Sequence, residues 1–147
     1  MNLFKTNTKQ TRPTNPPTNH SPRTALVPKI ADSPIAQGLL SGKYSAANPP
    51  AGPRRAFFTD ARFKDVSVLI DLLKKVGAEH GGATPAQVSL NWLLCKGALP
   101  IPGAKTAAQV ADLAGALGWR LGDGEVAELD AVSARIPSSS GAPFEKW

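Results

Sequence analysis

The sequence predicts an α/β fold in which two short parallel strands are each followed by helices. Two short apolar runs, "ALVPKIADSP" at residues 25–34 and "ALPIP" at residues 98–102, predict the strands. Between and after these runs, apolar residues recur with helical spacing, and Gly or Pro lies at the boundaries. Strands that alternate with helices pair in parallel. Since two strands form neither a closed barrel nor a self-sufficient sheet, we expect the chain to be the last part of a larger fold.

Residues 1–29 are predicted to be a disordered tail, because they are rich in Thr, Asn and Pro and show almost no apolar periodicity. They contain five basic residues and no Asp or Glu, whereas residues 30–147 contain 12 basic and 11 acidic residues, a net charge of only +1. The folded part therefore lacks the basic character of a nucleic-acid-binding domain, and no nucleic-acid partner is expected. An acid-free, hydroxyl-rich and basic segment resembles an organelle transit peptide, although a misplaced gene boundary explains it equally well.

The first expected strand lies near residue 30, and Pro28 restricts it to a strand start or a sheet edge. The segment "IAQGLLSGKY" at residues 35–44 is predicted to be a compact loop with two glycines. The next segment, "SAANPPAGPRRAFFTD" at residues 45–60, is predicted to be a loop because of its prolines and glycine.

Two helices should follow. The stretch "DARFKDVSVLIDLLKKVGAEHGG" places six apolar residues on one side, and Gly81-Gly82 ends it; those residues are Val66, Leu69, Ile70, Leu72, Leu73 and Val76. The stretch "TPAQVSLNWLLCKG" begins with a capping signature, in which Thr84 is the N-cap, Pro85 the first helical residue and Gln87 the reciprocal partner. This second helix is heavily apolar, and we expect it to end near Gly97.

The second expected strand, "ALPIP", precedes two further helices. The stretch "TAAQVADLAGALG" repeats the capping pattern with Thr106 and Gln109. The last helix, "DGEVAELDAVSARI", is predicted to begin near Asp123 and to end before Pro137.

Lys105 is the first candidate binding residue, because it is the last loop residue before a helix begins. The first N–H groups of a helix have no partners and its dipole is positive there, so that end attracts anions. A lysine at this position predicts a phosphate site, and the alternative is a solvated loop lysine.

Other kinds of site find little support in the sequence. The single cysteine, Cys95, excludes an internal disulfide and a cysteine-rich zinc site, and its apolar surroundings predict a buried, inert thiol. We expect no bound metal. No run approaches the roughly 18 apolar residues of a membrane-spanning helix, so no membrane partner is expected.

Four motifs carry a resemblance to a known family. "SPIAQGLLSGKY", "TPAQVSLNWLL", "PIPGAK" and "AGALGWRL" are similar, in this order and at this spacing, to segments of the aldo-keto reductases. The resemblance implies a (β/α)8 TIM barrel and NADPH-dependent carbonyl reduction. It covers residues 30–147 and corresponds only to the family's C-terminal portion, from the seventh strand onward. The ending "GAPFEKW" resembles the plastid-targeted plant branch, so the chain is expected in the cytoplasm or in plastids.

The resemblance also implies a cofactor site for NADP(H), formed by two loops. In the first loop, it assigns contacts with the pyrophosphate and ribose to Ser33, Pro34, Ile35 and Gly38, a place near the phosphates to Lys43, and a cover over the cofactor to Arg54. For Pro34 and Gly38 a purely conformational role is an equal alternative, and the register at Arg54 is open by one residue.

In the second loop, the resemblance implies that the site holds the adenosine 2′-phosphate, in agreement with the rule that barrel phosphate sites follow strands 7 and 8. Gly103 would let the backbone approach, and Lys105 would neutralise the phosphate. Gln109 would add a polar contact or serve only as a cap. Asp112 stands where the family places a Glu near the adenine.

The chain departs from the family at its catalytic residues. The family's tyrosine, lysine, aspartate and histidine lie in the first half of the barrel, so we expect no catalytic residue here. The single tyrosine, Tyr44, matches a non-catalytic position, and His20 and His80 are expected to be solvent-exposed. Asp32 stands where an aromatic residue usually packs on the nicotinamide, and it adds negative charge beside an anionic cofactor. Leu113 stands where many members have an adenine-reading Asn.

Three functions remain open at this stage. The first is an aldo-keto-reductase-type NADP-dependent oxidoreductase for small carbonyl substrates, truncated and inactive alone. The second is a non-catalytic module that binds NADP or completes a barrel with an N-terminal half-barrel partner, and the third is a partial gene product without function. Unpaired strand edges predict a marginally stable chain that self-associates. Phe144 and Trp147 either line the substrate site or belong to a loosely packed end.

Overall fold

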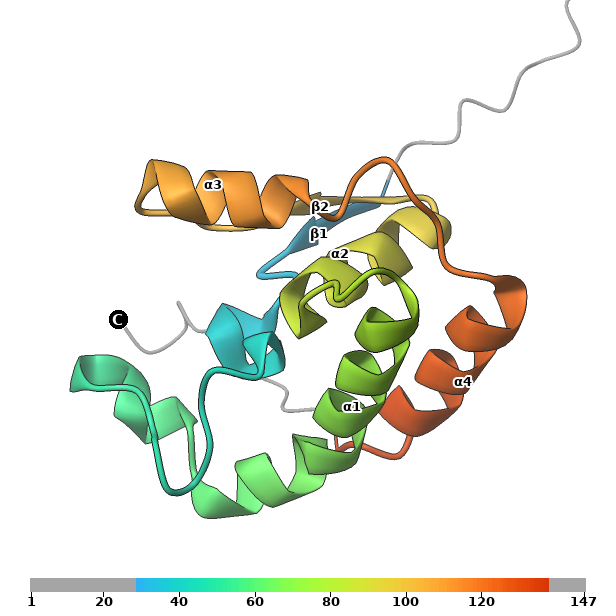
Figure 1. Cartoon of the computed structure of the whole chain (residues 1–147). Helices are drawn as coiled ribbons and strands as arrows, with labels where there is room; N and C mark the ends of the chain where they lie inside the picture. Colours follow the sequence, from blue (N-terminus) through green and yellow to red (C-terminus); the bar gives the residue numbers. More distant parts are fainter. Residues whose placement is uncertain (1–28, 138–147) are drawn as a thin grey trace, which may run out of the picture.

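The computed structural model describes residues 29–137, apart from the side chains of residues 53 and 54, and it has the predicted α/β architecture. The described residues form two strands, two short 3-10 helices and four α-helices, and Figure 1 shows how they are arranged. Their order is β1 (Lys29–Asp32), η1 (Ala36–Ser41), η2 (Gly52–Phe57), α1 (Asp60–Glu79), α2 (Pro85–Cys95), β2 (Ala98–Ile101), α3 (Ala107–Ala114) and α4 (Asp123–Ser133). The predictions for the N-terminal tail, Phe144 and Trp147 fall outside the described residues.

Both expected strands are present, and they pair in parallel as predicted. The register runs from Lys29 opposite Ala98 to Asp32 opposite Ile101. The connection between the strands contains α1 and α2, as a parallel pairing requires. Because the strands are parallel, the loops that follow Asp32 and Ile101 leave the sheet at the same edge.

The core lies among the helices rather than on the sheet. Figure 1 shows α2 between the sheet and α1, with α4 beside α1, and the contacts between these elements agree. The six apolar residues predicted for one side of α1 are all buried. Val88 of α2 and Leu129 of α4 are completely buried and join Leu73 of α1 in one cluster. A second cluster forms where η1 and Phe58 pack on the first half of α1.

Capping groups fix where the helices begin. At α2 the predicted capping box is present: the Gln87 N–H donates to the Thr84 hydroxyl (3.3 Å), and the Thr84 N–H donates to the Gln87 side-chain oxygen (2.9 Å). At α3 only half of the predicted box forms. The Gln109 N–H donates to the Thr106 hydroxyl (3.2 Å), but the Gln109 side chain accepts from Lys105 instead (2.7 Å).

The two segments predicted as loops each contain a 3-10 helix, which corrects the sequence interpretation. In η1 the carbonyl of Ile35 accepts hydrogen bonds from the N–H groups of Gly38 (2.9 Å) and Leu40 (3.3 Å). Gly38 has a φ of 99°, which breaks the helical repeat, and Gly42 ends the segment with a φ of 71°. The turn is therefore held by backbone hydrogen bonds that leave no apolar periodicity in the sequence.

Asn91 of α2 organises the connection between α3 and α4. Its side chain is 1% exposed, and its amide nitrogen donates to the carbonyls of Ala116 (3.0 Å) and Trp119 (2.8 Å). Its side-chain oxygen accepts the N–H of Leu121 (3.0 Å). Cys95, one turn later, is half-buried rather than buried as predicted, because α2 turns one edge towards solvent there.

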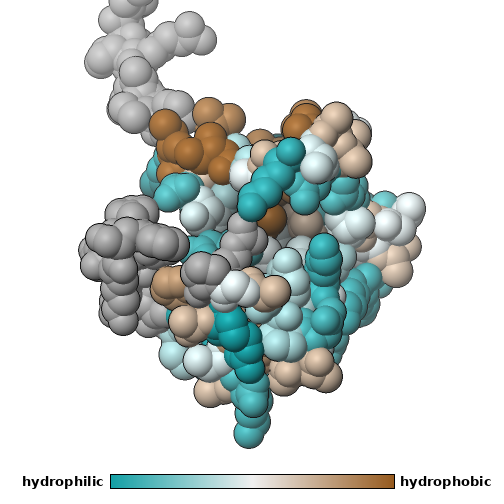
Figure 2. Space-filling view, turned by 90° about the vertical axis from the view of Figure 1, so that its left-hand side faces the viewer, coloured by the Kyte–Doolittle hydropathy of each residue, from teal (hydrophilic) through white to brown (hydrophobic). Residues whose placement is uncertain are grey.

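The sheet itself is poorly covered. Ile30, Leu99 and Ile101 are 65%, 51% and 52% exposed. Figure 2 shows brown, hydrophobic side chains at the upper end of the molecule, where Figure 1 places the sheet and α3. Parallel sheets normally have both faces covered. Among the described residues, no helix is long and apolar enough to cross a membrane.

Candidate functional site

The candidate site lies at the edge of the sheet where β1 and β2 end. Asp32 and Ile101 are register partners, so Ser33 and Pro102 begin the two loops side by side. One loop carries Ser33, Pro34, Ile35 and Gly38, and the other carries Gly103 and Lys105. The sheet therefore brings the two predicted groups of cofactor residues, about 70 positions apart in the sequence, to a common edge.

The loop after β1 has an unusual backbone. Ser33, Ala36 and Gln37 have φ values of 49°, 47° and 57°, in a region that residues other than glycine seldom adopt. The carbonyl of Ser33 accepts the N–H of Ala36 (2.8 Å) and closes a tight turn. Such strained conformations persist where the surrounding structure holds them, and they are common at ligand sites.

Gly38 has a conformational reason to be glycine. Its φ of 99° strains any other residue, and an added Cβ would lie 3.3 Å from the Tyr44 ring. Tyr44 packs edge-on against Phe58, with ring centroids 5.7 Å apart. Tyr44 thus has a packing role in this structure.

The loop after β2 presents an open backbone and one cation in front of α3. An added Cβ at Gly103 would have no atom within 4 Å, so a ligand can approach the main chain there. The Lys105 side chain is exposed, and its residue immediately precedes the N-cap Thr106. The positive end of the α3 dipole and Lys105 are therefore adjacent in the sequence.

Gln109 and Asp112 have structural partners in addition to their predicted roles. The Gln109 side-chain oxygen accepts the Lys105 N–H, which leaves its amide nitrogen as the group for a ligand. The carbonyl of Asp112 accepts a hydrogen bond from the Gln87 amide nitrogen (2.7 Å), and the Asp112 carboxylate lies 3.2 Å from the same nitrogen. Gln87 therefore ties α3 to the start of α2, a role that its capping position did not reveal.

Among the described side chains, that of Lys43 has no contact with the two loops. The Lys43 ammonium group lies 5.8 Å from the centroid of the Tyr44 ring, and its backbone contacts are with Ser41 and Asn48. Arg54 lies within η2, and its side chain falls outside what the structure describes.

Asp32 adds a negative charge at the same edge. Its carboxylate lies 3.5 Å from the Ser33 hydroxyl, which donates to it, and both residues are exposed. Within residues 29–137, no group of three or more His, Cys, Asp or Glu side chains could hold a metal ion. The edge therefore combines an accessible backbone, a helix N-terminus and Lys105 with the Asp32 carboxylate.

A second polar cluster joins α1 to α4, and the sequence analysis missed it. His80 was expected to be exposed, but its side chain is only 24% exposed. Its Nε2 atom lies 2.8 Å from Glu125 Oε1, and its ring lies on Trp119 with centroids 4.7 Å apart. The partners are 39 and 45 positions away, so no local pattern reveals them.

The contacts of this cluster lower the pKa of Glu125. Burial raises this pKa, but the Gly122 N–H and His80 both stabilise the carboxylate, and together they hold the pKa below its ordinary value. The Gly122 N–H donates to Glu125 Oε2 (2.7 Å), so the same carboxylate caps α4. The cluster therefore holds the start of α4 against the end of α1.

A neighbouring ion pair joins α2 to α4. Asp130 Oδ1 accepts hydrogen bonds from Lys96 Nζ (2.5 Å) and Trp92 Nε1 (3.0 Å). These two donors, Lys96 foremost, lower the pKa of Asp130 although burial raises it. Neither of these two clusters includes a predicted cofactor residue, and we interpret both as structural.

Comparison with known proteins identifies the family that this architecture resembles. The family model described as the aldo/keto reductase family matches residues 25–134. The chain is 38% identical over 110 residues to a chloroplastic pyridoxal reductase of Arabidopsis thaliana, covering 75% of this chain and 30% of that protein. It is 30% identical over 125 residues to the aldo-keto reductase yakc [NADP(+)] of Schizosaccharomyces pombe, covering 77% of this chain and 37% of that protein.

A solved structure extends the likeness to the fold. The glycerol dehydrogenase of Gluconobacter oxydans, an α/β barrel, matches with a TM-score of 0.64 and 24% identity, covering 78% of this chain and 36% of that chain. The predicted TIM-barrel fold class is thereby confirmed, although the described residues contain a two-stranded sheet and no closed barrel. The chain spans about a third of the length of the relatives it matches.

Proposed function

Because the chain belongs to the aldo/keto reductase family, we propose that its two strands hold the 2′-phosphate end of NADP(H). In this proposal the cofactor serves a barrel that reduces a small carbonyl substrate by hydride transfer. The yakc relative carries NADP(+) in its name, which supports the choice of cofactor. Lys105 faces the 2′-phosphate, Gly103 gives the phosphate access to the backbone, and Gln109 donates its amide N–H.

One observation carries this proposal: the parallel register places both predicted loops at a common edge, beside the start of α3. A phosphate at this position would meet unpaired helix N–H groups, an open glycine backbone and an ammonium group. Ser33, Pro34, Ile35 and Gly38 would border the pyrophosphate and ribose. Lys43, Arg54 and Asp112 are proposed at the periphery of the cofactor. The described contacts of Lys43 and Asp112 are with Tyr44 and Gln87, and Arg54 is assigned from the family resemblance alone.

Lys105→Ala tests the 2′-phosphate contact. We expect NADPH binding to weaken by about 1.5–3 kcal/mol, as for loss of a charge-assisted hydrogen bond, while NADH binding changes little. Isothermal titration with each cofactor measures the difference. Lys75→Ala, which removes an exposed lysine of α1, is the matched control and should leave both affinities unchanged. Equal weakening for NADPH and NADH in Lys105→Ala would contradict the assignment.

We further propose that this chain alone does not turn over substrate, because the family resemblance places the catalytic tyrosine, lysine, aspartate and histidine in the first half of the barrel and matches this chain only to the C-terminal portion. The chain, purified free of host reductases, should not oxidise NADPH in the presence of an aldehyde. NADPH oxidation faster than in a mock purification from cells without the protein would overturn this part of the proposal.

A second candidate function, completion of a barrel together with an N-terminal half-barrel, is favoured by the exposed sheet. Ile30, Leu99 and Ile101 are each at least half exposed, although strands of a parallel sheet are normally covered. Co-expression with the first six strands of a related barrel would test it. Co-purification of the two pieces with NADPH binding supports this function, and separate elution of the pieces opposes it.

We propose plastids as the location, because the pyridoxal reductase relative is chloroplastic and residues 1–29 contain no acidic residue. A fluorescent protein that carries residues 1–29 at its N-terminus should enter plastids. Fluorescence in the cytoplasm would show that residues 1–29 are not a plastid-targeting signal and would contradict this proposal.

A further inference from the structure

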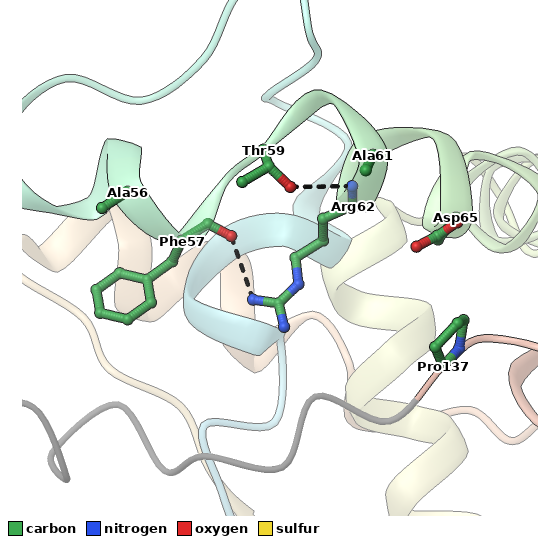
Figure 3. A pocket seen from close by; sticks show the side chains of 7 residues that line it. All are labelled: Ala56, Phe57, Thr59, Ala61, Arg62, Asp65 and Pro137. Atoms are coloured by element: carbon green, nitrogen blue, oxygen red, sulfur yellow. Dashed lines mark hydrogen bonds between the residues drawn. The ribbon is translucent and has the colours of Figure 1, made fainter.

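A groove along the first half of α1 lies mostly outside the proposed cofactor site and shares only Ser33 with it. Two adjoining pockets, of about 500 and 380 Å³, share Phe57, Arg62, Asp65 and Pro137 in their linings, and together they form what we call the α1 groove. Figure 3 shows the smaller pocket, with the guanidinium group of Arg62 turned towards the carbonyl of Phe57. That hydrogen bond measures 3.2 Å.

The lining of the α1 groove includes two side chains of opposite charge, Arg62 and Asp65. The larger pocket is otherwise lined mainly by apolar side chains from η1, η2, α1 and α2, among them Leu39, Phe57 and Trp92. Arg62 and Asp65 lie three positions apart on α1 and therefore on one face of the helix. An occupant that fits the groove presents large apolar side chains and charges of both signs.

The chain itself leads into this groove. Ile136 packs against both hydrophobic clusters of the core, and Pro137 lines both pockets. The sequence continues as "SSSGAPFEKW", residues 138–147. This segment contains Phe144 and Trp147 and, between them, the adjacent charges Glu145 and Lys146. Its composition therefore matches the groove, with aromatic side chains for the apolar lining and one charge to pair with each of Arg62 and Asp65.

The reach of this segment is sufficient. From Arg62 to Leu69, the α1 residues that line the larger pocket span about 10 Å at 1.5 Å per residue. Phe144 is seven residues beyond Pro137, and an extended chain of seven residues reaches about 23 Å. The segment can therefore lie along the whole groove, even with a turn in "SSSG".

We propose that residues 138–147 dock in the α1 groove, with Phe144 and Trp147 filling its apolar floor. Glu145 pairs with Arg62, and Lys146 pairs with Asp65. Ser33, Ala36 and Gln37 border the same groove, and within residues 29–137 these are the non-glycine residues with positive φ. The docked segment therefore packs against the strained loop after β1 and supports it.

Photocrosslinking tests this inference without removing an aromatic ring. With p-benzoylphenylalanine in place of Phe144, irradiation of the full chain should give intramolecular crosslinks to residues 56–69. Mass spectrometry identifies the crosslinked peptides. The same replacement at Phe4, in the N-terminal segment, is the matched control and should not crosslink there. Crosslinks from position 144 that map to the sheet, to α3 or to a second copy of the chain would overturn the proposal.

Hydrogen exchange provides a second measurement. In the double variant Phe144→Ala/Trp147→Ala, the amides of residues 60–69 should exchange about tenfold faster, because local opening becomes easier, while those of α3 do not change. Unchanged exchange in residues 60–69 would contradict docking. If exchange rises throughout the chain, the position of the crosslink alone decides.

Discussion

At the residue scale, Asn91 has more buried hydrogen bonds than any other described side chain, and the connection from α3 to α4 depends on it. It satisfies two carbonyls and one N–H of that connection, and the contacts with Ala116 and Leu121 are buried. A buried polar group that loses its partner costs about 1–3 kcal/mol, and two such groups are affected here. Asn91 therefore stabilises the fold through its hydrogen bonds to backbone groups rather than through its own burial.

Asn91→Ala should destabilise the chain by about 3 kcal/mol, within the range for broken buried networks. Urea-induced unfolding followed by tryptophan fluorescence measures the change. Asn48→Ala, which removes an exposed amide with a single 3.4 Å contact, is the control and should change stability by less than about 0.5 kcal/mol. An equal decrease in the free energy of unfolding of both variants would show that the buried hydrogen bonds of Asn91 contribute no more than an exposed one.

At the element scale, the junction of α1 and α2 depends on the absence of a side chain at Gly77. An added Cβ at Gly77 would overlap the carbonyl oxygen of Ala83 in the turn that joins the two helices. At Gly124, on the second residue of α4, an added Cβ would have no atom within 4 Å. The two helical glycines therefore differ only in their surroundings.

We expect Gly77→Ala to destabilise the chain by about 1–3 kcal/mol, the usual cost of overpacking. Gly124→Ala should instead be neutral or stabilising by up to about 1 kcal/mol, because alanine favours the helix. Thermal unfolding monitored by circular dichroism compares the two variants. Destabilisation by Gly124→Ala equal to that by Gly77→Ala would show that the overlap with the Ala83 carbonyl is not the cause of the effect.

The attachment of α4 should depend on pH through Glu125. The pKa of Glu125 is lower in the folded chain than its ordinary value of 4.5. The Glu125 carboxylate therefore contributes its full stabilisation above pH 4.5. This stabilisation is lost as the pH falls through the pKa of the folded chain. Glu125→Gln should therefore cost up to about 1 kcal/mol at pH 7 and progressively less below pH 4.5.

Urea unfolding at pH 7 and pH 3 measures this difference. Glu128→Gln, on the exposed side of the same helix, is the matched control, and its effect should not depend on the pH. A Glu125→Gln effect of the same size at both pH values would contradict the role assigned to the carboxylate.

The elements that the sequence predicts well are those with local signals. Thr84, Pro85 and Gln87 predict the start of α2, and the hydrogen bonds confirm it. The apolar spacing on α1 correctly identifies its buried side. The sequence did not reveal η1, whose turn depends on backbone hydrogen bonds, or the contact between His80 and Glu125, which requires the packing of α4 on α1.

The roles of the candidate site residues stay predictions. The register of β1 and β2 ends at Asp32 and Ile101, so the loops that carry Ser33 and Gly103 leave the sheet at the same edge. The second role of Asp112, as the acceptor for Gln87, follows from the approach of α3 to α2 and has no signal in the sequence near either residue.

At the scale of the whole molecule, the sheet is the part that the chain leaves incomplete. Each strand has a single partner within the described residues, so each has one edge without a neighbouring strand. Ile101, in the last register pair, is 52% exposed, and Ile30 and Leu99 are exposed beside it. Open strand edges with apolar side chains favour association with other strands. In a complete barrel, neighbouring strands would occupy both edges.

The chain alone should therefore self-associate through this sheet. Sedimentation velocity should show concentration-dependent oligomers, and Ile101→Lys should shift them towards monomer, because a lysine at an edge opposes pairing. Val68→Lys is the matched control: Val68 is 64% exposed on α1, away from the sheet, and its replacement should leave association unchanged. A monomeric chain with a cooperative thermal transition would show that the exposed sheet is tolerated in water. An equal shift towards monomer in Ile101→Lys and Val68→Lys would show that net charge, rather than the strand edge, controls association.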